Sequence, residues 1–592
     1  MTMFLSSQPQ PSATFSLMVI EGALTVVAVA ASFAWPRLGT RLFTFIGFHF
    51  NRLARKPVLS LLVVALAPLL IRLVILPIHP IPMPFAPDDF SNLLAADTFV
   101  HGRLANATPV MWTHFETIHV DMLPTYASMY FPSQGLLMAA GKVLFGQPWF
   151  GVLISGAVMC AAILWMLQGW LPPSWALLGG FLAIIRIALF SYWTSTYHTA
   201  GPICAIGGAL VLGAFPRFKR SVQARHLAIM AAGAVILALS RPYEGLLLCL
   251  PVVIALLSWL TQTRRLSASR FLIRATPAFV LLIAGIGWLG YYDYKAFGNP
   301  LTLPYTINRA TYAMAPYYVW QEPRPEPHYR HAEMRRFYQI DELDDYNRNH
   351  SVGGFFMMTT VKAVRGIYFF TGMALIPPLF LLPWAVRDRR IRFLVISLAL
   401  LAAGMAIEIY LIPHYLAPFT AVFYAVGLQA LRHLYQCRLG GQPVGRAMTH
   451  WVIAICVLMA VLRPFNRQLG CAIPEKPVST WIVSWFGPDY FVTERSLVER
   501  QLEDAAGAQL AIVRYSPDHD PLDEWVYNGA DIDSSKIIWA RAMDPANDAD
   551  LIRYYGQRKA WLVLPDSASN QVAPYPLAQQ VTGVSPHGLA ER

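Results

Sequence analysis

Two adjacent carboxylates, Asp88 and Asp89, follow an apolar stretch near 57–78 that is long enough to cross a membrane. Neighbouring acids repel each other and avoid an apolar phase, so their place at a membrane surface needs a reason. A carboxylate there can take the proton from an attacking hydroxyl group. An aspartate can equally cap a surface helix, and the pair alone does not separate the two interpretations.

A second charged group interrupts the apolar run 227–260 as Ser240-Arg241-Pro242-Tyr243-Glu244. The run is too long for one membrane span and just long enough for two short ones, so the break is predicted at a membrane edge. Charges at such an edge are costly and usually functional, which makes Arg241 a candidate anion ligand. The alternative is a mutual Arg241–Glu244 pair that only closes a turn.

Several histidines complete the set of candidates. His414 and Tyr415 lie between two predicted spans, and His198 lies at the end of another. The string from His114 through Glu116 to His119 has a spacing that matches no metal-ligand pattern. We therefore expect these three as polar residues that cover a pocket, and the sequence indicates no metal and no other cofactor.

The elements that position these residues are membrane helices. The chain has 592 residues, of which 56% are hydrophobic and 14% charged, and its mean hydropathy is +0.43. A soluble protein carries roughly 25% charged residues. The composition and the recurring apolar runs predict a polytopic α-helical membrane protein with about twelve transmembrane helices. The net charge of +12 comes from basic loops between the spans, so it predicts cytoplasmic loops and no nucleic-acid partner.

The charge pattern places both long loops and the tail on the extracytoplasmic face. The tail is predicted as a small α/β domain with strands at 509–515, 536–541 and 560–564. Its helix is predicted over 547–555, capped by Asn547 or Asp548. The segment 132–146 is too short to span and is predicted as an interfacial helix. The predicted domains are an N-terminal transmembrane helix with a basic cytoplasmic loop (1–56), a transmembrane core with long loops at 79–133 and 293–365 (57–463), and the extracytoplasmic domain (464–592).

Five motifs occur in a fixed order on one predicted membrane face. Listed in chain order, they are Asp88-Asp89, Ala95-Ala96 with Gly102-Arg103-Leu104, Tyr130-Phe131-Pro132-Ser133-Gln134-Gly135 with Leu144-Phe145-Gly146, Ser240-Arg241-Pro242, and His414-Tyr415-Leu416-Ala417-Pro418. Over roughly 57–432 the chain resembles the polyprenyl-phosphate-sugar-dependent glycosyltransferases of the GT-C fold, the protein-mannosyltransferase and aminoarabinose-transferase relatives. It departs from them at Ser133, where the family has a second proline, and at 128–130, where a basic residue is often found.

The resemblance implies a GT-C-like core in a bacterial inner membrane, with its active site on the extracytoplasmic face. It implies transfer of a hexose or pentose from a polyprenyl phosphate to a glycan, lipid or protein acceptor. One of Asp88 and Asp89 would be the base, and a cation would stabilise the leaving phosphate. Arg241 is the first choice for this cation, Arg365 and His414 are alternatives, and Glu244, Tyr415 and His198 belong to the same expected site. A single carboxylate base predicts inversion, since retention needs a second carboxylate as nucleophile.

Two other functions stay open at this point. A transporter or flippase of lipid-linked saccharides shares the hydrophobic bulk, but it predicts broken spans and paired repeats, neither of which is evident. A non-catalytic membrane scaffold that presents the tail has no need of Asp88, Asp89 or Arg241.

Overall fold

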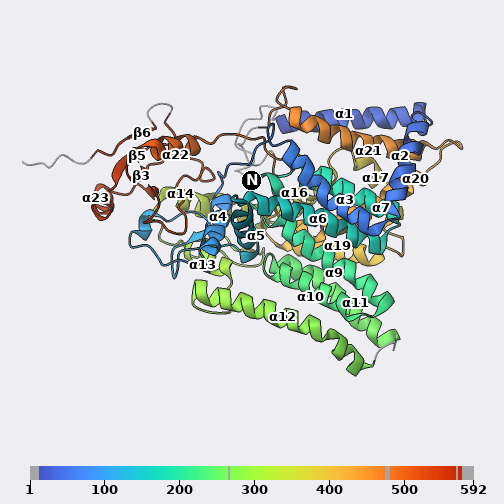
Figure 1. Cartoon of the computed structure of the whole chain (residues 1–592), viewed down its shortest axis with the longest axis horizontal. Helices are drawn as coiled ribbons and strands as arrows, with labels where there is room; N and C mark the ends of the chain where they lie inside the picture. The colour runs from blue at the N-terminus through green and yellow to red at the C-terminus, as the bar shows by residue number, and fades with distance from the viewer. Residues whose placement is uncertain (1–12, 264–266, 474–480, 568–570, 577–592) are drawn as a thin grey trace, which may run out of the picture.

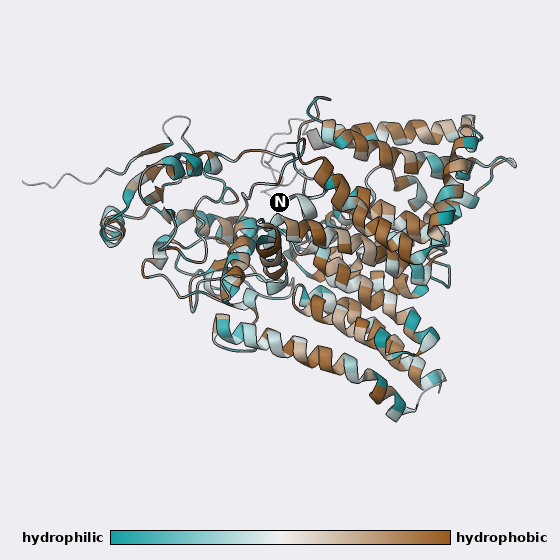
Figure 2. Cartoon of the chain, viewed as in Figure 1, coloured by the Kyte–Doolittle hydropathy of each residue, from teal (hydrophilic) through white to brown (hydrophobic). Residues whose placement is uncertain are grey.

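The computed structural model describes residues 13–263, 267–473, 481–567 and 571–576. Part of one predicted basic loop (264–266) and the last residues of the tail lie outside the described residues. Figure 1 shows long helices side by side at one end of the molecule and the strands of the tail at the other. The helical end is the more hydrophobic of the two (Figure 2).

The helical part matches the predicted class of fold. Seven helices in the described residues are long and apolar enough to cross a membrane, and three apolar helices are shorter, so a count of twelve is not confirmed. The seven are α1 (Ala13–Ala34), α3 (Pro57–Val74), α6 (Trp149–Trp170), α9 (Gly201–Ser221), α11 (Pro242–Thr263), α12 (Ala268–Phe297) and α21 (Val444–Leu462). The shorter three are α7 (Pro173–Ala183) continued by η2 (Ile184–Ala188), α10 (Ala224–Ala238) and α19 (Arg392–Ile407).

The predicted break in the apolar run 227–260 is confirmed, because α10 ends at Ala238 and α11 begins at Pro242. The predicted loop 293–365 is too long, because helix α16 (Val352–Thr371) begins within it. The helix stops before Gly372, whose φ is +56°. Only the single-turn helices α17 (Ile376–Leu379) and α18 (Leu382–Ala385) follow, since the prolines there lack the N–H groups that a longer helix needs.

The first long loop contains the elements that position the candidate site. Helix α4 (Pro87–Val100) starts at the acidic pair and packs against α5 (Pro132–Phe145), which fulfils the prediction of a short helix there. Helix α5 ends at Gly146, whose φ of 77° suits the residue after a helix. Between them, η1 (Trp112–His114) leads to a hairpin of β1 (Val120–Asp121) and β2 (Ala127–Ser128).

The remaining elements lie in the second loop and around the core. The second loop holds α13 (Pro304–Tyr312), α14 (Ala332–Arg335), η3 (Arg336–Asp341) and α15 (Glu342–His350). The core adds α2 (Thr40–Ala54), α8 (Tyr192–Ser195), η4 (Pro413–Phe419), α20 (Thr420–Gln436) and η5 (Arg463–Phe465).

The tail folds as a four-stranded sheet in the order β4-β3-β5-β6. Strand β3 (Gln509–Val513) pairs in parallel with β4 (Ile537–Arg541) and β5 (Lys559–Val563), and β6 (Val572–Pro574) is antiparallel to β5. The three predicted strands are therefore present. The sheet is flanked by α22 (Glu494–Asp504) and α23 (Pro545–Tyr554).

The predicted cap of the tail helix is wrong. Asp544, and not Asn547 or Asp548, caps α23, and its carboxylate accepts the N–H groups of Ala546 and Asn547. Pro545 at the first helical position explains the earlier start, since its fixed φ suits that position.

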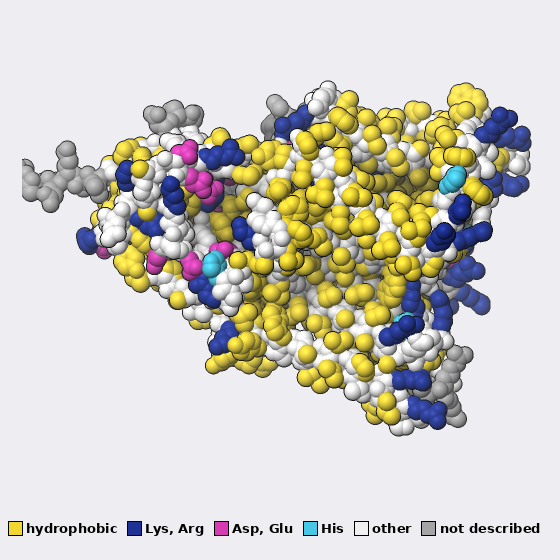
Figure 3. All heavy atoms as spheres, in the orientation of Figure 1, with side chains coloured by type: hydrophobic (Ala, Val, Ile, Leu, Met, Phe, Trp, Pro, Cys, Tyr) yellow, Lys and Arg dark blue, Asp and Glu magenta, His cyan; other side chains and the backbone are white. Residues whose placement is uncertain are grey.

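The tail shares its hydrophobic core with the first loop. Leu94, Phe115 and Tyr126 of the loop pack in one buried cluster with Leu510 and Ile538 of the tail. The tail is therefore held firmly over the segment that carries the acidic pair. Figure 3 shows Lys and Arg side chains gathered at the end of the molecule opposite the tail, and acidic side chains on the tail side. This distribution agrees with the charge pattern used to predict orientation, which itself stays a prediction.

Candidate functional site

Asp88 and Asp89 occupy the first turn of α4, where the helix dipole favours negative charge. Asp89 is fully buried and turned toward the backbone. Its carboxylate accepts the N–H groups of Phe85 and Ala86 at 3.3 and 3.4 Å and that of Tyr197 at 3.0 Å. Burial raises the pKa of Asp89 to about 7 against the opposing effect of these donors. Asp89 thus joins α4 to the segment before α9.

Asp88 faces the other way, into a polar cluster, and its side chain keeps 16% exposure. The hydroxyl of Tyr130 donates a hydrogen bond to Oδ1. The Nδ1 atoms of His119 and His198 lie 3.6 and 3.7 Å from Oδ2. Burial alone would raise the pKa of Asp88, but the two histidines and the hydrogen bonds from His119 and Tyr130 hold it well below its usual range. Asp88 is therefore ionised at neutral pH and has the form of a base.

The cluster continues through a second pair of rings. The rings of His198 and His414 are 5.7 Å apart, and Nδ1 of His414 lies 3.0 Å from the hydroxyl of Tyr192. Burial lowers the pKa of both histidines, with the neighbouring cation Arg241 adding to the effect. Both imidazoles are thus neutral near pH 7.

Arg241 lies at the break between α10 and α11, at the far end of this cluster. Its Nη1 is 2.8 Å from Oε1 of Glu244, so the predicted pair exists. Its guanidinium also lies over the ring of Tyr415, with Cζ 3.8 Å from the ring centre. Tyr415 in turn packs edge-on against His414 at 4.9 Å. A fixed cation thus stands at the end of a series of contacts that begins at Asp88.

Most of the residues singled out in the sequence therefore come together. The contacts connect Asp88, His198, His414, Tyr415, Arg241 and Glu244. Arg365 lies on α16 near Asp345, and the contacts above do not include it. Within the described residues, no group of three or more His, Cys, Asp or Glu side chains is arranged to hold a metal ion.

Two members of the cluster, Tyr130 and Tyr192, were not among the candidate site residues named from the sequence. Tyr130 has a signal, since it opens the turn motif before α5. His119 was expected, together with His114 and Glu116, to cover a pocket, and it does lie against Asp88 and Tyr130. The contacts of His114 and Glu116 are with other parts of the molecule. His114 lies 3.0 Å from the carbonyl oxygen of Arg541 in the tail. Glu116 accepts hydrogen bonds from Tyr312 at 3.0 Å and Arg330 at 3.3 Å.

The fold and site define a helical membrane protein with a carboxylate–imidazole–arginine cluster, and its tail packs against the loop that carries Asp88. No protein-family model and no curated protein matches this chain. Solved structures do resemble it. ArnT from Cupriavidus metallidurans in the apo state has 12% identity and a TM-score of 0.46, over 84% of this chain and 92% of that one. The same enzyme bound to undecaprenyl phosphate has 13% identity and a TM-score of 0.44, over 84% and 92%.

An archaeal enzyme is similar as well. The oligosaccharyltransferase AglB from Archaeoglobus fulgidus, in complex with an inhibitory peptide and a dolichol-phosphate, has 10% identity and a TM-score of 0.41. The match covers 86% of this chain and 69% of that one. ArnT, an aminoarabinose transferase, and AglB are both GT-C fold enzymes, the fold that the motif order resembles. All three TM-scores lie below 0.5.

Proposed function

We propose that this protein is a membrane glycosyltransferase that moves a sugar from a polyprenyl-phosphate donor to an extracytoplasmic acceptor with inversion. One observation carries the proposal: an ionised, partly exposed carboxylate, Asp88, is connected through imidazole and tyrosine contacts to a fixed arginine, Arg241. Displacement of a phosphate by a hydroxyl needs these two groups, a proton acceptor on one side and a cation on the other.

The chemical step follows from this arrangement. The acceptor hydroxyl loses its proton to Asp88 while its oxygen bonds to the anomeric carbon. The bond from that carbon to the phosphate oxygen breaks, and the electron pair leaves with the polyprenyl phosphate. Arg241 stabilises the developing charge on the phosphate. Asp89 is occupied by backbone N–H groups, so only one carboxylate of the pair faces the reactants, and inversion is expected.

Neutral histidines suit this scheme. His198 and His414 lie between the base and the arginine, where a hydrogen-bonding but uncharged surface can hold the hydroxyl groups of a sugar. A charged imidazole there would compete with Arg241 for the phosphate. The hydroxyl of Tyr130 and the ring of His119 fix the orientation of the Asp88 carboxylate.

Analysis of lipid-linked sugars and surface glycans can identify both the carrier and the acceptor. Undecaprenyl phosphate and dolichol phosphate occur in the similar solved structures, so both are first choices as carriers. Mass spectrometry of lipid-linked sugars and surface glycans compares cells with and without the protein. In cells without the protein, we expect one sugar to be missing from the glycans and its lipid-linked form to accumulate. Unchanged glycans and unchanged lipid-linked sugars would contradict the proposal.

A further inference from the structure

The backbone of His119 is held in an uncommon conformation. Its φ is +65°, and among the non-glycine residues that the structure describes only Val222 shares a positive φ. Residues in this region persist when surrounding contacts hold them there, and they concentrate at functional sites. In this conformation the imidazole of His119 reaches both Asp88 and Tyr130, with Nδ1 3.1 Å from the hydroxyl of Tyr130.

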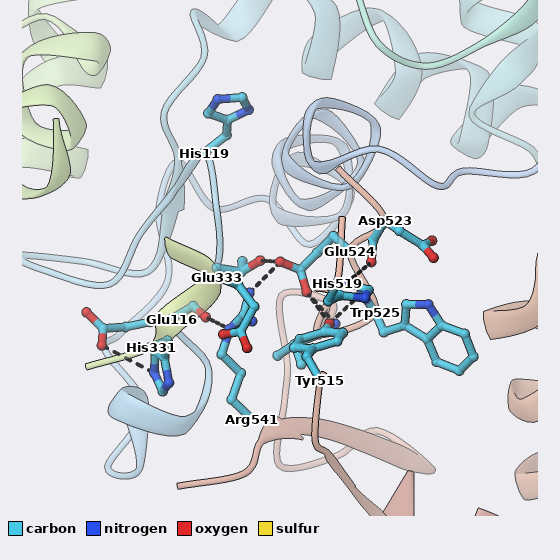
Figure 4. A network of polar contacts seen from close by, with 12 residues as sticks. Glu116, His119, His331, Glu333, Tyr515, His519, Asp523, Glu524, Trp525 and Arg541 are labelled. Carbon is cyan, nitrogen blue, oxygen red and sulfur yellow. Dashed lines mark hydrogen bonds and ion pairs between the residues drawn. The ribbon is translucent and has the colours of Figure 1, made fainter. Parts of the chain in front are cut away.

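Two of the contacts that hold the chain just before His119 come from the tail. Nε of Arg541, at the end of β4, donates to the carbonyl oxygen of Glu116 at 2.6 Å. The hydroxyl of Thr117 donates to Oε2 of Glu524 at 2.5 Å. Arg541 and Glu524 are themselves paired at 2.5 Å. Figure 4 shows Arg541 and Glu524 meeting the segment of Glu116, while His119 stands apart from this network.

This clamp, formed by Arg541 and Glu524, is buried and hydrogen-bonded on both sides. Arg541, Glu524 and Thr117 are all nearly inaccessible to solvent. The second oxygen of Glu524 accepts the hydroxyl of Tyr515 at 2.8 Å and the N–H of Val526 at 2.7 Å. Loss of one partner would leave a buried charge without its counter-charge, so the clamp resists opening.

The backbone of His119 itself is held by residues of the two long loops. Its carbonyl oxygen accepts the hydroxyl of Ser91 at 2.7 Å and the N–H of Met129 at 3.2 Å, and its own N–H donates to the hydroxyl of Tyr338 at 3.4 Å. Ser91 lies on α4, one turn after Asp88. The backbone of His119 is thus held by α4 and the two long loops, while the tail holds Glu116 and Thr117 close before it in the chain.

We propose that the tail domain is a positioning module for the active site: the Arg541–Glu524 clamp on residues 116–117 keeps His119 in the conformation that places its imidazole against Asp88. The inference rests on the proposed function for its activity test. It gives Thr117, Glu524 and Arg541 the role of positioning residues, none of which contacts the reacting atoms.

A released clamp changes the electrostatics of Asp88. The titratable and charged groups around Asp88 are Tyr130 and His119 from the first loop, His198 before α9, and Asp89 on α4, with Arg241 and His414 beyond them. Retreat of His119 removes one of the contacts that keep the pKa of Asp88 low, while burial still acts to raise it. The acid limb of the activity profile should therefore move to higher pH.

The test is Thr117→Val, which keeps the shape and removes the hydroxyl that Glu524 accepts. Its matched control is Tyr126→Phe, which removes another hydroxyl between loop and tail, the one that donates to the carbonyl oxygen of Asn528 at 2.8 Å. In purified full-length protein we expect the acid limb of the kcat profile to move to higher pH in Thr117→Val, with kcat on the plateau above the acid limb within about twofold of wild type. Tyr126→Phe should keep the wild-type profile. Thr117→Ser should keep it as well, because serine retains the hydroxyl that donates to Glu524.

Amide hydrogen exchange tests whether the clamp holds this segment, and it needs no transferase assay. Amides of residues 117–121 should exchange faster in Thr117→Val than in Tyr126→Phe or wild type. If no preparation transfers sugar, the proposed function fails while the exchange result still tests the clamp. An unchanged pH profile together with unchanged exchange in Thr117→Val would overturn the inference. An equal loss of kcat at every pH would overturn it as well, because a merely structural role predicts that result.

Discussion

At the scale of single residues, neighbouring aspartates have different tasks because their surroundings differ. Asp89 is bonded to backbone N–H groups on two segments, whereas Asp88 faces a hydroxyl and two imidazoles. The surroundings of Arg241 are equally specific: its guanidinium forms an ion pair with Glu244 and lies over the face of the Tyr415 ring. A rigid cation of this kind can meet a phosphate without reorganising.

Arg241→Ala should therefore weaken transfer strongly. A charge-assisted contact to phosphate contributes about 1.5–3 kcal/mol, which corresponds to a loss of about tenfold or more in kcat/KM for the lipid-linked donor. Arg241→Lys keeps the charge and should keep part of the activity. Glu244→Gln is the control, since it removes the pair but leaves the cation. If Arg241→Ala transfers sugar at the wild-type rate, the pair with Glu244 is only structural.

Asp121 offers a test of the electrostatics through stability. It is buried, Oδ1 accepts a hydrogen bond from Asn308 at 3.1 Å, and burial raises its pKa from 3.8 to about 8. Because the folded state holds the proton of Asp121 more tightly than the unfolded state, protonated Asp121 contributes its full stabilisation of the fold below pH 3.8. This contribution to the free energy of unfolding is lost as the pH rises toward 8. The melting temperature of the wild type should fall over this range, and Asp121→Asn should fall less. An identical pH dependence in both proteins would contradict the assigned burial.

At the scale of elements, close packing of helices sets the distances within the site. A Cβ at Gly208 of α9 would stand 1.8 Å from the carbonyl oxygen of Pro418 in η4, the element that carries His414 and Tyr415. Gly208→Ala should therefore push η4 away, reduce stability by about 1–3 kcal/mol and lower transfer. Gly427→Ala on α20 is the control, because a Cβ there meets nothing within 4 Å. Equal activity of both variants would mean that η4 does not position the site.

The local elements were predictable where the chain signals its own boundaries. Helix α5 begins at Pro132 and ends before Gly146, and the break at Arg241 follows from the length of the apolar run. The predicted loop 293–365 includes most of helix α16, because Lys362 and Arg365 interrupt the apolar pattern of that helix. The structure buries Lys362, whose ammonium group donates to the carbonyl oxygen of Glu408. Such long-range compensation cannot be read from local periodicity.

The sequence indicates which charged residues belong to the site, but it does not indicate how they are arranged in space. Asp88, Arg241 and His414 could be named because charged or polar residues at the ends of apolar runs need a reason. The difference between Asp88 and Asp89 could not be predicted, since it depends on the N–H of Tyr197, which is distant in the chain. The role of His119 depends on Arg541 and Glu524, which are more distant still.

At the scale of the whole molecule, the tail and the basic loops occupy opposite ends (Figure 3). The positive-inside rule then predicts that the tail, both long loops and the N-terminus face outside the cytoplasm. A reporter fused after Arg592 should be active only in an assay for the exported side, and one fused in the basic loop after Arg390 should be active only in the cytoplasm. The reverse pattern would place Asp88 on the wrong side of the membrane for the proposed donor.

The central claim is that Asp88 is the base of a sugar transfer. Its most direct test is transfer from a polyprenyl-phosphate sugar by purified Asp88→Asn and Asp89→Asn proteins. Loss of a general base costs about 10²–10⁴-fold in rate, so Asp88→Asn should be nearly inactive although it inserts and accumulates normally. Asp89→Asn keeps an oxygen that can accept backbone N–H groups, so we expect impaired but measurable activity. Full activity of both variants and of the double variant would contradict the proposed mechanism.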